Sequence, residues 1–186
     1  GNPVQGKAFI SDDRGKTWEH LVDFPFMMAR PFEAGNRIYI LGLAGDLTII
    51  FSEDGGKTWS QQSKLTEGEQ WTQAPCNVHY DKGNIYLVMN RRPYSDIKAW
   101  PVSVEAPVLM RAKAEDDLMQ RENWTFASEL VFRDVIDQDE LDYFGVPFYK
   151  TPYKEATQVA PGRGCAPMGW LETNVVQIKD KSHYWY

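Results

Sequence analysis

Basic residues are in short supply in this sequence. It contains 20 Lys and Arg against 26 Asp and Glu, which gives a formal net charge of -6 at pH 7 and a pI near 5.1. Nucleic-acid-binding proteins usually present a basic face to the phosphates. The longest Lys/Arg run here is the pair Arg91-Arg92. The charge balance therefore argues against a nucleic-acid partner.

Cysteine pairs and long apolar runs are also lacking. Cys76 and Cys165 are too few for a disulfide scaffold and lack metal-ligand spacing; whether they pair is left open. No window approaches the roughly 18 to 20 apolar residues of a membrane span, and Gly1 does not open a signal peptide. The three histidines form no metal or triad pattern. We therefore expect no transmembrane segment, no metal site and no cofactor, with calcium binding left open.

What the chain does have is strand after strand. At 186 residues, with 42% hydrophobic and 13% aromatic content, it can bury the core of one globular domain. Runs rich in β-branched and aromatic residues alternate with Gly, Asn and Asp turn signals. The expected strands of the first full unit are 30–32, 37–43, 47–52 and 59–62. Those of the second are 74–80, 84–90, 106–112 and 124–128, and a last unit has strands on either side of a turn at 179–181.

One turn is written twice, in Phe9–Leu21 and in Ile50–Gln62, with the pattern Ser-x-Asp-x-Gly-x-Thr-Trp. The glycine supplies a backbone conformation closed to most residues, and the aspartate can accept turn amide hydrogens. We expect the serine and threonine to add local hydrogen bonds and both tryptophans to be largely buried between sheets. The predicted structural residues are Ser11, Asp13, Gly15, Thr17, Trp18, Ser52, Asp54, Gly56, Thr58 and Trp59.

A four-stranded unit repeating at a period in the forties is typical of a β-propeller blade. The repeated turn resembles the Asp-box (BNR) repeat of the sialidase superfamily of propellers. The stretch "AKAEDDLMQRENW", 112–124, resembles a lengthened, degenerate box of bacterial sialidase-like proteins. "GWLETNVVQI", 169–178, resembles the sialidase segment whose glutamate pairs with the catalytic tyrosine, although Thr173 stands where we expect Gly.

The predicted fold is therefore all-β: a sialidase-like β-propeller, six-bladed when complete, with four-stranded antiparallel blades and Asp-box turns. Six blades need roughly 270 residues, so we expect residues 1–186 to form a single but incomplete domain of about four blades. The segment 130–167 fits no strand cleanly and is interpreted as a long loop insert, either a lid over the site or a simple insertion.

In a propeller, the starts of innermost strands and the loops between second and third strands open on one face, opposite the Asp boxes. Arg30, in a strand start, and Asp46, in a loop, are candidates on that face. The others lie in one long loop: Arg91, Arg92, Tyr94, Asp96 and Trp100. Each has a structural alternative: a surface arginine beside a proline, an ordinary turn aspartate, solvated loop charges, or aromatic packing of the loop.

Glu172 stands in a strand expected to line the central channel, where an unpaired carboxylate would be costly. The resemblance implies that it activates a tyrosine nucleophile, with an aspartate as general acid/base, here placed at Asp46, and three arginines binding the sugar carboxylate. We expect the tyrosine and two of the arginines to lie beyond the end of this chain. Structural pairing of Glu172 is the alternative.

The function predicted from this resemblance is a sialidase-like glycoside hydrolase that removes a terminal sialic acid or similar sugar from glycans. A non-catalytic carbohydrate-binding propeller is the main alternative, and a protein-interaction propeller is the third. A glycan is the expected partner, and the family implies secretion or a periplasmic location. Whether the protein is an enzyme, its sugar and linkage preference, and its oligomeric state are left open.

Overall fold

A computed structural model describes residues 5–73, 77–93, 105–131, 157–160, 163–165, 170, 172–178 and 184–185, and the described chain is all-β. It contains antiparallel sheets and no α-helix within these ranges; a 3₁₀ turn, η2, spans Arg121–Asn123. The chain divides into two compact units. The first consists of Gly1–Glu69, Tyr80–Ile85 and Arg111–Thr125, and the second of Gln70–His79, Tyr86–Met110 and Phe126–Tyr186.

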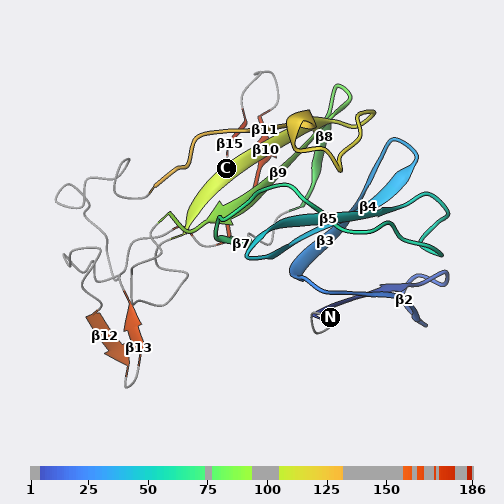
Figure 1. Cartoon of the computed structure of the whole chain (residues 1–186), viewed down its shortest axis with the longest axis horizontal. Helices are drawn as coiled ribbons and strands as arrows, with labels where there is room; N and C mark the ends of the chain where they lie inside the picture. The colour runs from blue at the N-terminus through green and yellow to red at the C-terminus, as the bar shows by residue number, and fades with distance from the viewer. Residues whose placement is uncertain are drawn as a thin grey trace. The chain divides into compact units, whose positions relative to one another are not determined.

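The first unit holds a hairpin and a four-stranded sheet. Strands β1 (Gly6–Ile10) and β2 (Glu19–Phe24) pair around the first Asp-box turn. Strands β3 (Met27–Ala34), β4 (Arg37–Ala44), β5 (Asp46–Ser52) and β6 (Ser63–Lys64) follow in that spatial order, and Figure 1 shows β3, β4 and β5 side by side. This antiparallel order confirms the predicted four-stranded unit.

The fourth strand of this sheet begins later than predicted. The sequence indicated 59–62, whereas β6 is Ser63–Lys64. At Ser60 the backbone N–H donates to the Phe51 carbonyl over 2.9 Å, but the hydroxyl of Ser60 takes the Phe51 N–H over 3.0 Å. A side chain thus replaces one backbone bond of the ladder, and regular pairing resumes only after it.

The core of the first unit forms where apolar strand faces meet. Central strand β4 is buried along most of its length, which fits its nearly continuous apolar run. Phe24, Phe26, Ile40 and Ile50 form a buried cluster, against which side chains of the β1–β2 hairpin also pack. A side chain at Gly42 would meet the Phe26 ring at 2.7 Å, so glycine lets this ring lie directly on β4.

The next sheet has the order β11-β10-β9-β7, with β8 also paired to β9. Its strands are β7 (Trp71–Gln73), β8 (His79–Asp81), β9 (Asn84–Arg91), β10 (Ala106–Lys113) and β11 (Trp124–Phe126). The strand predicted at 74–80 corresponds to two short pieces, β7 and β8. Lys82 (φ 47°) and Gly83 (φ 75°) supply the two positive φ angles of the predicted tight turn into β9.

Two further hairpins follow in the second unit. β14 (Val176–Gln177) pairs with β15 (Tyr184–Trp185), which confirms the strands predicted around 179–181. β12 (Thr157–Ala160) pairs with β13 (Arg163–Cys165). The prediction that 130–167 contains no strand is therefore wrong, because this hairpin lies within it. The single domain and its six-bladed closure stay predictions.

Candidate functional site

Glu172 occupies an unusual backbone position in the second unit. Its φ is 56°, in the left-handed region that non-glycine residues rarely adopt, and its side chain is exposed. Such strain persists only where the surroundings impose it, and it is concentrated at functional sites. Its carboxylate is therefore presented to solvent from a constrained backbone.

The constraint comes from residues on either side of Glu172. On one side, the Trp170 N–H donates to the Glu105 carbonyl over 3.0 Å, and the Trp170 carbonyl accepts from the Asn90 amide over 3.4 Å. On the other, the Thr173 hydroxyl donates to Asn90 Oδ1 over 2.9 Å. Asn90 ends β9 and Glu105 directly precedes β10. The segment carrying Glu172 is thus fastened to the β9–β10 pair.

Asn90 and Glu105 form a buried polar pair beneath this segment. Asn90 is fully buried, Glu105 is 4% exposed, and Asn90 Nδ2 donates to Glu105 Oε2 over 2.8 Å. Burial raises the pKa of Glu105 above its usual range, although Asn90, the Thr72 hydroxyl and the Arg92 guanidinium act in the opposite direction. Sequence reasoning missed both residues. The available signal was a polar residue ending one apolar strand and an acid opening the next.

The arginines predicted for the site have different surroundings. Arg91 forms an ion pair with Glu129 across the second unit, with both side chains partly accessible. Arg92 donates its backbone N–H to the Gln70 carbonyl over 2.8 Å, and its guanidinium lowers the pKa of Glu105. Arg30 belongs to the first unit, where it is 6% exposed on β3. The structure thus brings Arg92 toward the buried acid of the Glu172 segment, and the sugar-binding role of all three arginines stays a prediction.

Asp46 braces a loop of the first unit. Its carboxylate accepts the Glu69 N–H over 2.9 Å, the Gly68 N–H over 3.2 Å and the Thr66 hydroxyl over 3.1 Å. Lys64 Nζ lies 3.7 Å from Oδ2. Burial opposes ionisation, but these hydrogen bonds lower the pKa of Asp46. This geometry favours the turn role weighed from the sequence, and a role as general acid stays a prediction. Tyr94, Asp96, Trp100 and Cys76 lie outside the described residues.

The two Asp-box turns close in the same way. Asp13 Oδ1 accepts the N–H groups of Lys16 and Thr17 over 2.9 and 2.8 Å, and Oδ2 accepts the Thr17 hydroxyl over 2.7 Å. The Ser11 hydroxyl accepts the Gly15 N–H over 2.6 Å, and Gly15 has φ 84°. In the second box the corresponding bonds to Asp54 and Ser52 measure 2.6 to 2.9 Å. Each box is thus a self-contained turn.

Acid should weaken these turns. The hydrogen bonds from Thr17 lower the pKa of Asp13 from 3.8 to about 2. A depressed folded-state pKa contributes stability that is present above 3.8 and lost as the pH falls toward about 2. We expect Asp13→Asn to reduce the loss of stability between pH 5 and pH 2.5, measured as the urea midpoint at each pH.

Asp12→Asn is the matched control, because the exposed Asp12 adjoins Asp13 and the substitution changes the net charge equally. It should leave the acid dependence close to that of the wild type. Identical pH profiles for both variants would contradict the assignment of acid sensitivity to Asp13.

The two box tryptophans do not share one environment. Trp59 is partly buried, packs against the core cluster around Phe26 and donates its indole N–H to the Gly56 carbonyl over 2.9 Å. Trp18 is 64% exposed. The prediction that both are largely buried is therefore wrong for Trp18. A box tryptophan is buried only where another sheet element covers it, as β1 and β2 do beside Trp59.

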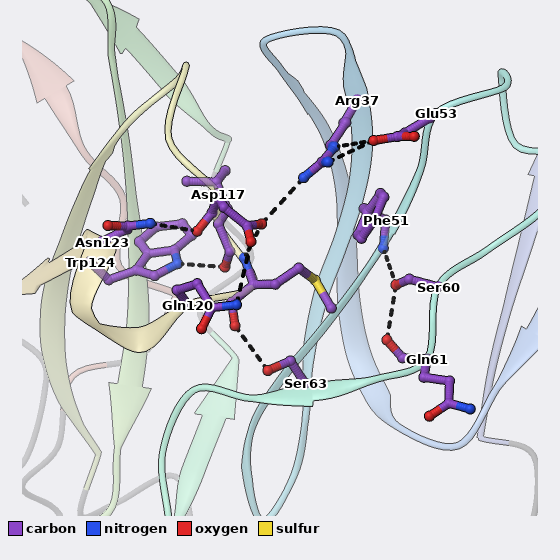
Figure 2. Close-up of polar contacts among 12 residues, drawn as sticks. Arg37, Phe51, Glu53, Ser60, Gln61, Ser63, Asp117, Gln120, Asn123 and Trp124 are labelled. Atoms are coloured by element: carbon purple, nitrogen blue, oxygen red, sulfur yellow. Dashed lines mark hydrogen bonds and ion pairs between the residues drawn. The ribbon is translucent and has the colours of Figure 1, made fainter.

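The degenerate third box keeps the tryptophan contact. Trp124 is buried, and its indole N–H donates to the Leu118 carbonyl over 2.9 Å, as in the second box. The Asn123 amide donates to the Asp117 carbonyl over 2.8 Å (Figure 2). The Asp117 carboxylate accepts only one N–H of its own turn backbone among the described bonds, from Met119 over 3.3 Å.

Arg37 of β4 links the second box to the third. Figure 2 shows its guanidinium between Glu53, which it contacts at 2.6 Å, and Asp117, at 3.2 Å. The same group lies 4.2 Å from the centre of the Phe51 ring. The Ser63 hydroxyl adds a bond of 2.9 Å to the Met119 carbonyl. The third turn is therefore held partly by the neighbouring sheet.

These features define an all-β protein whose antiparallel strands are joined by turns closed through Ser, Asp and Thr side chains. The family model described as BNR/Asp-box repeat matches residues 9–20 and 50–61. The chain thus carries two BNR/Asp-box repeats, consistent with a sialidase-like repeat protein. No curated protein matches it.

Two further findings concern the described ranges alone. No helix there is long and apolar enough to cross a membrane. No group of three or more His, Cys, Asp or Glu side chains there could hold a metal ion.

Proposed function

We propose that this protein is a sialidase-like glycoside hydrolase on an Asp-box β-propeller, acting on a terminal sialic acid or similar anionic sugar of a glycan. The observation that carries the proposal is the exposed carboxylate of Glu172 on a strained backbone, φ 56°, held from both sides by buried polar contacts. The two BNR/Asp-box repeats support the same class.

The chemistry assigns Glu172 the role of a base. A sialic acid carries its negative charge next to the anomeric carbon, so a neutral tyrosine hydroxyl approaches it without the repulsion that a carboxylate nucleophile would meet. As the tyrosine oxygen bonds to the anomeric carbon, its proton passes to the Glu172 carboxylate. The glycosidic oxygen takes a proton from a general acid and leaves as an alcohol, and water then releases the sugar. Arginine suits the sugar carboxylate through paired hydrogen bonds.

A second candidate is a carbohydrate-binding propeller without catalysis. It is favoured by Asp46, whose carboxylate accepts hydrogen bonds from Thr66, Gly68 and Glu69 and has a lowered pKa. A general acid must hold a proton near the working pH, which requires a raised pKa. In this alternative, the same face binds the glycan and leaves it intact.

An assay of the wild-type protein separates the two candidates. Turnover of a fluorogenic sialoside, within a panel of neutral and anionic glycosides, is expected if the hydrolase proposal is right. Binding to sialylated glycans on an array without release of free sugar would favour the second candidate. Neither turnover nor binding on either panel would overturn both.

A further inference from the structure

We propose, resting on the role of Glu172 above, that Asn90 is a positioning residue that fixes the Glu172 carboxylate by tying the residues on both sides of it, Trp170 and Thr173, to the end of β9. No catalytic contact is assigned to Asn90 itself. It would act through the backbone that carries Glu172.

The hydrogen bonds of Asn90 use both ends of its amide. Oδ1 accepts the Thr173 hydroxyl over 2.9 Å, while Nδ2 donates to Glu105 Oε2 over 2.8 Å and to the Trp170 carbonyl over 3.4 Å. A carbonyl can only accept, so Nδ2 and not Oδ1 must face Trp170. The amide orientation is therefore determined by its partners, and one side chain serves both sides of Glu172.

Burial makes this arrangement rigid. Asn90 is fully buried, and Glu105 holds its Nδ2 from the first residue before β10. The Glu105 carbonyl also accepts the Trp170 N–H over 3.0 Å. Val175, 6% exposed, adds an apolar anchor just beyond Thr173. Between these anchors, Glu172 adopts its positive φ with no side-chain packing of its own, since it is exposed.

The direct measurement is hydrogen exchange of the segment 170–178. Thr173→Val keeps the shape of the side chain and removes the donor to Asn90, and Asn90→Ala removes both ties. We expect exchange in 170–178 to become faster, by roughly tenfold in Asn90→Ala and by less in Thr173→Val, while peptides of the β3–β6 sheet are unchanged. Thr173→Ser restores the hydroxyl and should restore the wild-type rate.

Asn84→Ala is the matched control. Asn84 begins the same strand, β9, and its amide bonds only to the nearby carbonyls of Asp81 and Lys82. It should leave exchange in 170–178 unchanged. In turnover assays, Asn90→Ala and Thr173→Val should lower kcat, at most by roughly 10²-fold, with little change in KM, because the substrate contacts remain and the base is misplaced.

The outcomes are distinguishable. Unchanged exchange in 170–178 in both folded variants would overturn the positioning role, whatever the turnover. If Asn90→Ala does not fold, Thr173→Val decides, since it alters only one partly buried hydroxyl. Faster exchange in the variants of a wild type that hydrolyses no glycoside would overturn the proposed hydrolase and confirm the tie. Faster exchange with kcat unchanged would show that the tie does not position the base.

Discussion

Glu172→Gln is expected to lower turnover of a fluorogenic sialoside by roughly 10² to 10⁴, the range typical of a lost general acid or base. Glutamine keeps the size of the side chain and most of its hydrogen bonding but cannot take the proton of a nucleophile. The side chain is exposed and the strained backbone at φ 56° is retained, so the fold should change little. The measurements are kcat and KM for both proteins, with melting temperatures alongside.

Glu122→Gln serves as the control for the change of charge. Glu122 is also exposed, but it lies in the η2 turn of the first unit. Its turnover should match that of the wild type. Equal turnover in the Glu172→Gln protein and the wild type would sink the catalytic assignment, and loss of folding would favour the structural ion pair weighed from the sequence.

Phe26→Ala should cost about 3 to 5 kcal/mol of unfolding free energy. The Phe26 ring is fully buried, lies 4.5 Å from the Phe24 ring between centroids, and covers β4 at Gly42. Truncation removes this apolar burial and leaves a cavity that strands paired on both sides cannot close. Urea unfolding at neutral pH measures the loss.

Phe9→Ala is the companion variant, because it deletes the same ring from a side chain that is 51% exposed. Its edge contact with His20, at 5.4 Å between centroids, limits the expected cost to at most about 1 kcal/mol. Similar losses in the two variants would contradict the placement of the core at Phe26.

The strands of the first sheet could be predicted because their pattern is local. Alternating and continuous apolar runs separated by Gly, Asn and Asp turns mark β3, β4 and β5 within a residue or a few of their bounds. Two predictions failed for reasons that no local pattern carries. The start of β6 depends on the Ser60 side chain taking a backbone bond, and the exposure of Trp18 depends on whether another element covers it.

The site was predictable only in part. Glu172 was identified from a motif, and the structure adds its strained backbone and its anchors. The bond from Thr173 to Asn90 joins residues far apart in the chain, and neither residue type signals such a bond in sequence. Thr173, which departs from the glycine expected there, supplies that bond. The roles assigned to Asp46, Arg30, Arg91 and Arg92 stay predictions.

The Arg37 contacts make the repeats unequal partners in unfolding. The turns at Asp13 and Asp54 are closed by bonds within eight residues, so each can persist while the rest of the chain opens. The turn at Asp117 draws on Arg37 and Ser63 of the preceding sheet and should lose order as soon as that sheet opens. A repeat whose turn has drifted from its pattern thereby becomes conditional on its neighbour, and this dependence converts a row of similar units into a cooperative structure.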